Sequence, residues 1–229
     1  MEHFDIVKIR DRVWRIWDSE KDSFYLVEGE SCAAVIDTGI TPGARITPML
    51  RTLTQKPLIL IVTHAHEDHF YHMDEFDTVY MSHEEFKLGE AILREMMAGK
   101  NLALEKTIHI ETGSVIDLGG CTLEICQVPG HTPGSVTIYD ARDEIVFTGD
   151  AIGSGCGVWM QLPGSSSLTD YEESLRTFLR WLLDRGGHMD FWGGHCDQSW
   201  ESRQVPGFNP VSIGLLADLI DLVRNVRNG

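Results

Sequence analysis

Four short segments of the sequence concentrate histidine and aspartate at spacings that suit a metal centre. The densest is THAHEDH over residues 63–69, and the others are PGHTPG, FTGD and GGH. Together they supply His64, His66, Asp68, His69, His131, Asp150 and His195. Burying such polar groups without partners is costly, whereas zinc, iron and manganese all accept imidazole and carboxylate ligands. One segment alone would suit a hydrogen-bonded histidine or a charged, solvated loop, but the four together favour a metal site.

Each of these segments lies at or near the end of an apolar run that reads as a β-strand. The runs are LILIV (58–62), CTLEICQV (121–128), EIVFTG (144–149) and DFWGG (190–194). LILIV is continuously apolar, which is typical of a strand buried on both faces. Further strands are predicted over residues 5–9, 13–17, 23–28, 32–37, 78–82, 106–110, 114–118 and 135–140, separated by polar turns.

Helices are predicted after each of the two β-rich blocks. They cover residues 42–53, 83–100, 167–185 and 210–226, with Ser167 or Thr169 as the cap of the third. Two sheets packed together with helices outside them, in a single domain over residues 1–229, would satisfy this order. The two blocks show no sequence repeat.

Composition limits the classes of partner. The formal net charge is −16, from 19 Lys and Arg and 35 Asp and Glu, which argues against nucleic-acid and anionic-membrane partners. No apolar run approaches the length of a membrane span, and the charged start MEHFDIVKIR does not resemble a signal peptide. The five cysteines have no tight paired spacing, which favours free thiols and a cytoplasmic setting.

The pattern HAHEDH, GHTPGS, TGD and GGH resembles the metallo-β-lactamase-fold superfamily of hydrolases. His131 follows His69 by 62 residues, Asp150 follows after 19 more, and His195 after a further 45. VIDTG at residues 35–39 also resembles an early strand end of the family, so the similarity spans most of the chain. The resemblance implies an α+β fold, a four-layer αββα sandwich with metals at the edge between the sheets.

The resemblance also implies roles for the seven residues. One metal would be held by His64, His66 and His131, and a second by Asp68, His69 and His195, with Asp150 bridging both. Zinc suits these ligands, and iron or manganese is also accepted. Two such ions would lower the pKa of a shared water, so that hydroxide attacks a carbonyl or phosphoryl centre. Asp68 is a further candidate to accept a proton.

Several neighbouring residues have two readings. Asp37 either orients a ligand histidine or simply forms a turn. Phe70, Tyr71 and His72 replace the small residues often found in the family, and either narrow the pocket or pack on the core. Trp159, Met160, Trp192, Phe24 and Tyr25 either wall an apolar pocket or belong to the core. Tyr171 weakly matches a lactonase tyrosine, and Cys196 is read as a packing thiol.

Departures from the family narrow the function. Glutamate at position 66 would suggest a di-iron flavin relative, but His66 stands there. Zinc β-lactamases usually carry cysteine where Asp150 stands, and the C-terminal region is short for glyoxalase II. The leading hypothesis is a binuclear, di-zinc hydrolase of a small ester, lactone or thioester. The alternatives are a phosphodiesterase or phosphonate hydrolase, a mononuclear iron persulfide dioxygenase, and a non-catalytic metal-binding protein. The C-terminal helix and glycine-rich loop offer surfaces for a homodimer, although no feature requires one.

Overall fold

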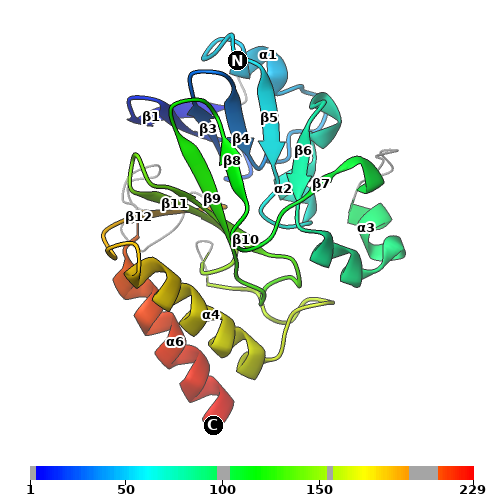
Figure 1. Cartoon of the computed structure of the whole chain (residues 1–229). Helices are drawn as coiled ribbons and strands as arrows, with labels where there is room; N and C mark the ends of the chain where they lie inside the picture. Colours follow the sequence, from blue (N-terminus) through cyan, green and yellow to red (C-terminus); the bar gives the residue numbers. More distant parts are fainter. Residues whose placement is uncertain (1–3, 97–103, 154–156, 196–210) are drawn as a thin grey trace.

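Two β-sheets packed face to face form the centre of the molecule, and helices cover their outer faces (Figure 1). The computed structural model describes residues 4–96, 104–153, 157–195 and 211–229. The first sheet has the order β1 (Asp5–Arg10), β2 (Val13–Trp17), β3 (Ser23–Glu28), β4 (Ala33–Ile36), β5 (Leu58–Ile61), β6 (Val79–Met81) and β7 (Ile108–His109). The second has the order β12 (Asp190–Gly193), β11 (Ile145–Gly149), β10 (Val136–Asp140), β9 (Thr122–Gln127) and β8 (Val115–Asp117).

Helices are divided between the two outer faces. The first sheet is flanked by α1 (Thr47–Leu50), α2 (Glu67–Phe70), α3 (Glu90–Met96) and the short 3-10 turns η1 (Met73–Glu75), η2 (His83–Leu88) and η3 (Leu104–Lys106). The second sheet is covered by α4 (Leu168–Leu183) and α6 (Ile213–Asn228), which lie side by side (Figure 1). Both sheets are mixed: β1 to β4 pair antiparallel and β4 to β7 parallel, while β11 and β12 form the parallel pair of the second sheet.

Side-chain alternation along the strands builds three apolar layers. On β3, Phe24 and Leu26 face the helices, whereas Tyr25 and Val27 face the second sheet. A third cluster lies between the second sheet and α4 and α6. Because successive side chains of a strand point to opposite faces, one strand supplies two layers at once. The predicted four-layer αββα sandwich is confirmed.

The helix prediction over residues 83–100 is wrong in its continuity. Residues 83–88 form a 3-10 turn capped by Ser82, and α3 begins only at Glu90. Gly89 separates them with a φ of +90°, a conformation that glycine adopts readily and that no α-helix contains. The helix expected over residues 42–53 is also shorter and covers only Thr47–Leu50.

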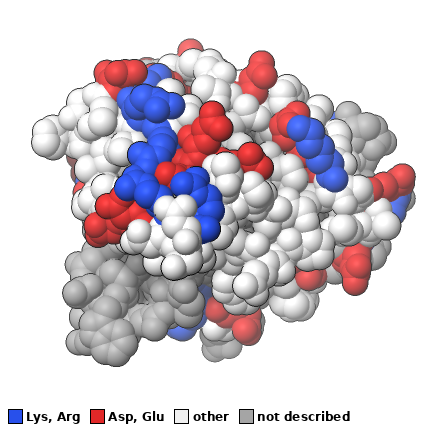
Figure 2. All heavy atoms as spheres, turned by 90° about the horizontal axis from the view of Figure 1, so that it is seen from below, with Lys and Arg blue, Asp and Glu red and all other residues white. Residues whose placement is uncertain are grey.

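The two long helices agree with the sequence. Ser167 caps α4 by accepting a hydrogen bond from the backbone N–H of Asp170. Glu172 of α4 is buried and pairs with Arg176, and with Arg224 and Arg227 of α6. Seen from below, basic and acidic side chains lie next to one another on this end of the molecule (Figure 2). None of the described helices is long and apolar enough to cross a membrane.

Long-range contacts connect the two sheets. Arg12, in the turn between β1 and β2, pairs with Asp140 at the end of β10: its Nη2 donates to Oδ2 at 2.6 Å and to Oδ1 at 2.8 Å. Cys121 lies in the core between the sheets, and Cys126 lies in the core beneath α4 and α6, so the two thiols are on opposite sides of the second sheet. Cys32, Cys121 and Cys126 are free thiols, while the predictions for Cys156 and Cys196 lie outside the described residues.

Candidate metal centre

The predicted ligands meet because their strands end at one edge of the sandwich. β4 and β5 are parallel and lead into Asp37 and the loop of residues 63–69. β11 and β12 are also parallel and lead into Asp150 and His195. His131 lies in the connection between β9 and β10, and the backbone N–H of Val136 on β10 donates to the carbonyl of Thr63 at 2.9 Å. All seven predicted residues therefore converge between the two sheets.

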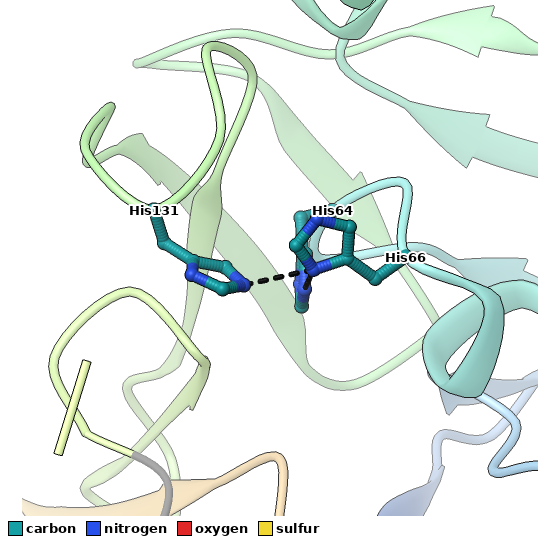
Figure 3. A group of neighbouring side chains, drawn as sticks. All are labelled: His64, His66 and His131. Atoms are coloured by element: carbon teal, nitrogen blue, oxygen red, sulfur yellow. Dashed lines mark hydrogen bonds between the residues drawn. The ribbon is translucent and has the colours of Figure 1, made fainter. Parts of the chain in front are cut away.

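Three histidines form the first part of the cluster (Figure 3). The Nδ1 atom of His66 lies 3.1 Å from Nε2 of His64 and 2.9 Å from Nε2 of His131. The three rings come from two loops that are far apart in sequence, and their nitrogens point toward one another (Figure 3). Nitrogens bound to one tetrahedral zinc at about 2.0–2.1 Å would lie roughly 3.3 Å apart, close to this spacing.

Burial keeps these three imidazoles neutral. It lowers the pKa of His64 well below its ordinary value, and neighbouring histidines lower it further. Burial likewise lowers the pKa of His66 to about 4, and it lowers the pKa of His131. Neutral imidazole is the form that binds a metal, so this part of the cluster is ready to do so at neutral pH.

Carboxylates accompany the remaining two histidines. Oδ2 of Asp68 lies 3.3 Å from Nε2 of His69 and 3.5 Å from Nε2 of His195. Asp150 lies between this set and the three histidines, with its oxygens 3.5 Å from Nε2 of His69, 3.3 Å from Nε2 of His195 and 3.8 Å from Nε2 of His131. Its position therefore matches that of a ligand shared by two ions.

The carboxylates and these two histidines stabilise one another's charges. Burial would raise the pKa of Asp68, but the nearby His69 and His195 together outweigh it and lower that pKa to about 2. Burial would also raise the pKa of Asp150, but His69, His195 and His64 together leave it well below its ordinary value. Burial would lower the pKa of His195, but hydrogen bonds to Asp150 and Asp22 raise it to about 10. Two protonated imidazoles thus supply positive charge where cations would otherwise sit.

The donor set fits a pair of divalent ions. Nε2 of His69 is buried and has no hydrogen-bond partner among the described residues, although two carboxylates lie near it. Once His69 loses its proton, this buried nitrogen has a lone pair that a cation can accept. Among the residues that the structure describes, the set holds five imidazoles, two carboxylates and no thiolate, which suits zinc and also iron or manganese. Metal binding itself stays a prediction.

Hydrogen bonds to the outer nitrogens orient the rings. Nδ1 of His69 lies 2.9 Å from Oδ2 of Asp37, and Nδ1 of His195 lies 2.9 Å from Oδ1 of Asp22. Nδ1 of His131 lies 2.8 Å from the carbonyl oxygen of Trp159. Each contact directs the opposite nitrogen, Nε2, into the cluster. Asp37 therefore orients His69, a predicted ligand, and its φ of +61° shows that it also forms the turn.

Two glycines leave the room that the cluster needs. A Cβ atom at Gly194 would lie 2.3 Å from Oδ1 of Asp150 and 2.5 Å from Cε1 of His69. At Gly149, which has a φ of +48°, a Cβ atom would lie 2.4 Å from Oγ1 of Thr63. A larger residue at either position would displace the groups that hold the ligands.

The bulky residues after His69 mostly pack inward. Phe70 is 1% exposed and belongs to the core beneath the first sheet. His72 is buried, and its Nδ1 lies 3.1 Å from Oε1 of Glu75. The packing interpretation therefore holds for both. Tyr171 is also buried: its hydroxyl donates to the carbonyl of Ala151 at 2.6 Å, and its ring packs against Gly130. It supports the ligand loops from behind, and the comparison with a lactonase tyrosine is not supported.

Among the aromatic residues considered for a pocket wall, most belong to the core. Phe24, Tyr25 and Trp192 are 0%, 2% and 4% exposed. Trp159 is the exception: its side chain is 67% exposed, and its carbonyl holds His131. It is the aromatic side chain of this group best placed to meet a substrate.

Residues of the first hairpin support His195, and the sequence did not indicate this role. Asp22 looked like part of a polar turn, yet it contacts the imidazole. Arg15 is 1% exposed and donates to the backbone carbonyl of His195 at 2.9 Å, and the Tyr25 hydroxyl donates to the carbonyl of Gly193 at 2.6 Å. The sequence offered one indication of this support, namely an arginine within β2 and an aspartate just before β3 in an otherwise apolar hairpin.

Replacing Asp37 by asparagine should weaken zinc binding by about 10–100-fold. The carboxylate accepts from the backbone N–H of Thr63 at 2.8 Å and from its hydroxyl at 2.7 Å, besides contacting His69. Asparagine tolerates the positive φ but turns an NH₂ group toward one of these donors. Competition with a chromogenic chelator measures the affinity. The control is Asp117→Asn, at an exposed residue that caps the Gly119 turn, and equal affinities in the two variants would contradict the prediction.

Comparisons with known proteins identify the family to which the sequence is similar. A sequence profile described as the metallo-beta-lactamase superfamily matches residues 22–187. The bovine acyl-coenzyme A thioesterase MBLAC2 is 27% identical over 221 residues, covering 78% of this chain and 77% of its own. Hydroxyacylglutathione hydrolase GloC of Haemophilus influenzae is 28% identical over 214 residues, covering 86% and 92%. The human mitochondrial persulfide dioxygenase ETHE1 is 30% identical over 143 residues, covering 59% and 50%.

Solved structures share the architecture. A metallo-beta-lactamase from Pontibacter korlensis superposes with a TM-score of 0.70 at 18% sequence identity, covering 97% of this chain and 99% of its own. At this identity the likeness concerns the fold alone. The αββα arrangement described above is therefore that of known metallo-β-lactamase structures.

Proposed function

Since this chain belongs to the metallo-β-lactamase superfamily, we propose that it is a binuclear, di-zinc hydrolase of a small-molecule thioester. Metal-dependent hydrolysis fits the cluster, and the thioester is the narrower part of the proposal. One observation carries the metal chemistry: Asp150 lies between the three-histidine set and the set of Asp68, His69 and His195.

Two divalent ions in these positions would supply an activated water and a Lewis acid for the substrate carbonyl. The chain's own groups then have distinct tasks. His64, His66 and His131 hold neutral ligand nitrogens, and Asp37 and Asp22 fix the rings of His69 and His195. Asp68, with 28% of its side chain exposed, is the carboxylate of the cluster best placed to take a proton from the reacting water.

The thioester class rests on the relatives. MBLAC2 is a thioesterase of acyl-coenzyme A, and GloC hydrolyses hydroxyacylglutathione. Coenzyme A and glutathione are both thiols, so both relatives point to an acyl group carried on sulfur. A thioester carbonyl needs the same activated water and polarised oxygen as other esters. A persulfide dioxygenase activity is the second candidate, because ETHE1 also matches.

The deciding assay compares substrates that differ in the bond that is broken. Purified protein would be offered acyl thioesters of coenzyme A and glutathione, matched oxygen esters, a lactone and a phosphodiester. Each would be tested after chelation and after reloading with zinc, manganese or iron. We expect thioester hydrolysis that chelation abolishes and zinc restores. Oxygen consumption with a persulfide in the iron-loaded protein, without thioester hydrolysis, would instead favour the second candidate.

A further inference from the structure

A buried carboxyl group lies behind the loops that carry the three histidines. It belongs to Glu85 in the 3-10 turn η2, and its side chain is 0% exposed. A glutamate is almost never fully buried unless it has partners. Its partners here come from two loops that are distant from it in sequence, and each loop carries ligand residues.

The first partner loop carries His131. The hydroxyl of Thr132, the next residue, donates to Oε1 of Glu85 at 2.5 Å. Two residues further on, a Cβ atom at Gly134 would lie 2.7 Å from Cγ of Glu85. Glycine at position 134 therefore lets the loop approach the glutamate as closely as a backbone can.

The second partner loop carries His64 and His66. The backbone N–H groups of Ala65, which lies between these two histidines, and of Gly134 lie close enough to the Glu85 carboxyl to lower its pKa. Burial is the larger effect and raises that pKa to about 7. One side chain thus accepts a hydrogen bond from the first loop and lies beside a backbone N–H of the second, while its Oε2 is buried without a hydrogen-bond partner among the described residues.

We propose that Glu85 is a positioning residue that holds residues 64–66 and 131–134 at the separation at which the three histidines bind a metal. Nδ1 of His66 lies 3.1 Å from Nε2 of His64 and 2.9 Å from Nε2 of His131. Small shifts of either loop would therefore change how well these nitrogens fit an ion. The inference rests on the proposed function in taking the cluster as a metal centre.

Substitution by glutamine tests the charge and the acceptors with little change of shape. A carboxylate has two acceptor oxygens, whereas an amide has one oxygen and an NH₂ group. In Glu85→Gln, the new NH₂ group would face the Thr132 hydroxyl or one of the nearby backbone N–H groups in a buried site. Thr132→Val removes the hydroxyl from the opposite side of the contact, and Thr132→Ser keeps it and serves as the matched control.

Zinc affinity measured by chelator competition is the main readout, and cobalt absorption reports the geometry of the bound ion. Glu172→Gln controls for loss of a buried glutamate, because its arginine partners lie on α4 and α6. The thermal midpoint of each metal-free variant separates stability from metal binding. None of these readouts depends on the substrate.

We expect Glu85→Gln and Thr132→Val each to weaken the binding of the more tightly held zinc ion by about 10–100-fold and to alter the absorption spectrum of bound cobalt. Thr132→Ser and Glu172→Gln should retain the affinity of the unaltered protein. Unchanged affinity in Glu85→Gln, with a fall in thermal midpoint like that of Glu172→Gln, would overturn the positioning role and leave the proposed function intact. If the unaltered protein bound no metal, the proposed function and the role of Glu85 would both fail.

Discussion

Asp150→Asn is expected to lower kcat/KM for the hydrolysed substrate by about 10³-fold or more and to release at least one metal ion. The carboxylate lies within 3.8 Å of His69, His131 and His195, so it serves both halves of the cluster. Asparagine removes one negative charge and places an NH₂ group against the ligands. Losing several kcal/mol of metal-ion stabilisation corresponds to that fall in rate.

Metal content and kinetics must be measured on the same preparation. Elemental analysis gives the zinc bound per chain, and initial rates give kcat/KM. Asp190→Asn is a suitable control, since Asp190 lies on β12, has 40% of its side chain exposed and pairs with Arg10 at 2.6 Å. A variant at position 150 that retained two ions and near-normal kcat/KM would contradict a bridging role.

Removal of the metal should lower the thermal midpoint of the protein, and the effect should grow with pH. A ligand present at 100 times its dissociation constant stabilises the fold by about 2.7 kcal/mol. In the metal-free protein the pKa of His195 is raised to about 10 from an ordinary value of 6.5. Its contribution to the stability of the metal-free fold is therefore complete below about pH 6.5 and is lost as the pH rises through about 10.

Zinc must displace protons from both His195 and His69. The pKa of His69 is also raised, because Asp68, Asp150 and Asp37 together outweigh the opposing effect of burial. Each proton released makes the affinity rise about tenfold per pH unit over that window. Asp68 has the opposite pH dependence, because its pKa is lowered to about 2. Its contribution to the stability of the metal-free fold is complete above about pH 3.8 and is lost as the pH falls through about 2.

Differential scanning fluorimetry at pH 6.5, 7.5 and 8.5 measures the thermal midpoint with and without zinc. The difference between the two midpoints is expected to increase with pH. Calorimetry in buffers of different ionisation enthalpy counts the protons released. Calcium is the control ion, because it prefers oxygen ligands and should stabilise the protein little. A zinc-induced shift that is constant or shrinks as the pH rises would refute the displacement of protons.

The sequence alone determined the layers of the fold and the members of the cluster. The β-branched and aromatic run SFYLVE predicts a strand over residues 23–28, and because the period of a strand is two residues, that strand buries Phe24 and Leu26 on one face and Tyr25 and Val27 on the other. Helix α4 was predictable for a similar local reason, with its apolar spacing and the cap at Ser167. The histidines and aspartates stood at the ends of such strands, so their convergence followed from the sheets.

Only the tertiary structure decided the contacts that hold these groups in place. Asp22 reaches His195 across 173 positions, Arg12 reaches Asp140 across 128, and Glu85 reaches Thr132 across 47. Local pattern carries no signal for such pairs, because Asp22 and Arg12 read as ordinary turn residues and Glu85 reads as an ordinary residue of the helix predicted over residues 83–100. The break at Gly89 was likewise hidden, because helical propensity outweighs a single glycine until packing requires the positive φ. Sequence pattern reports which face of an element is buried, while the partner of a buried polar group is set by where the chain returns in space.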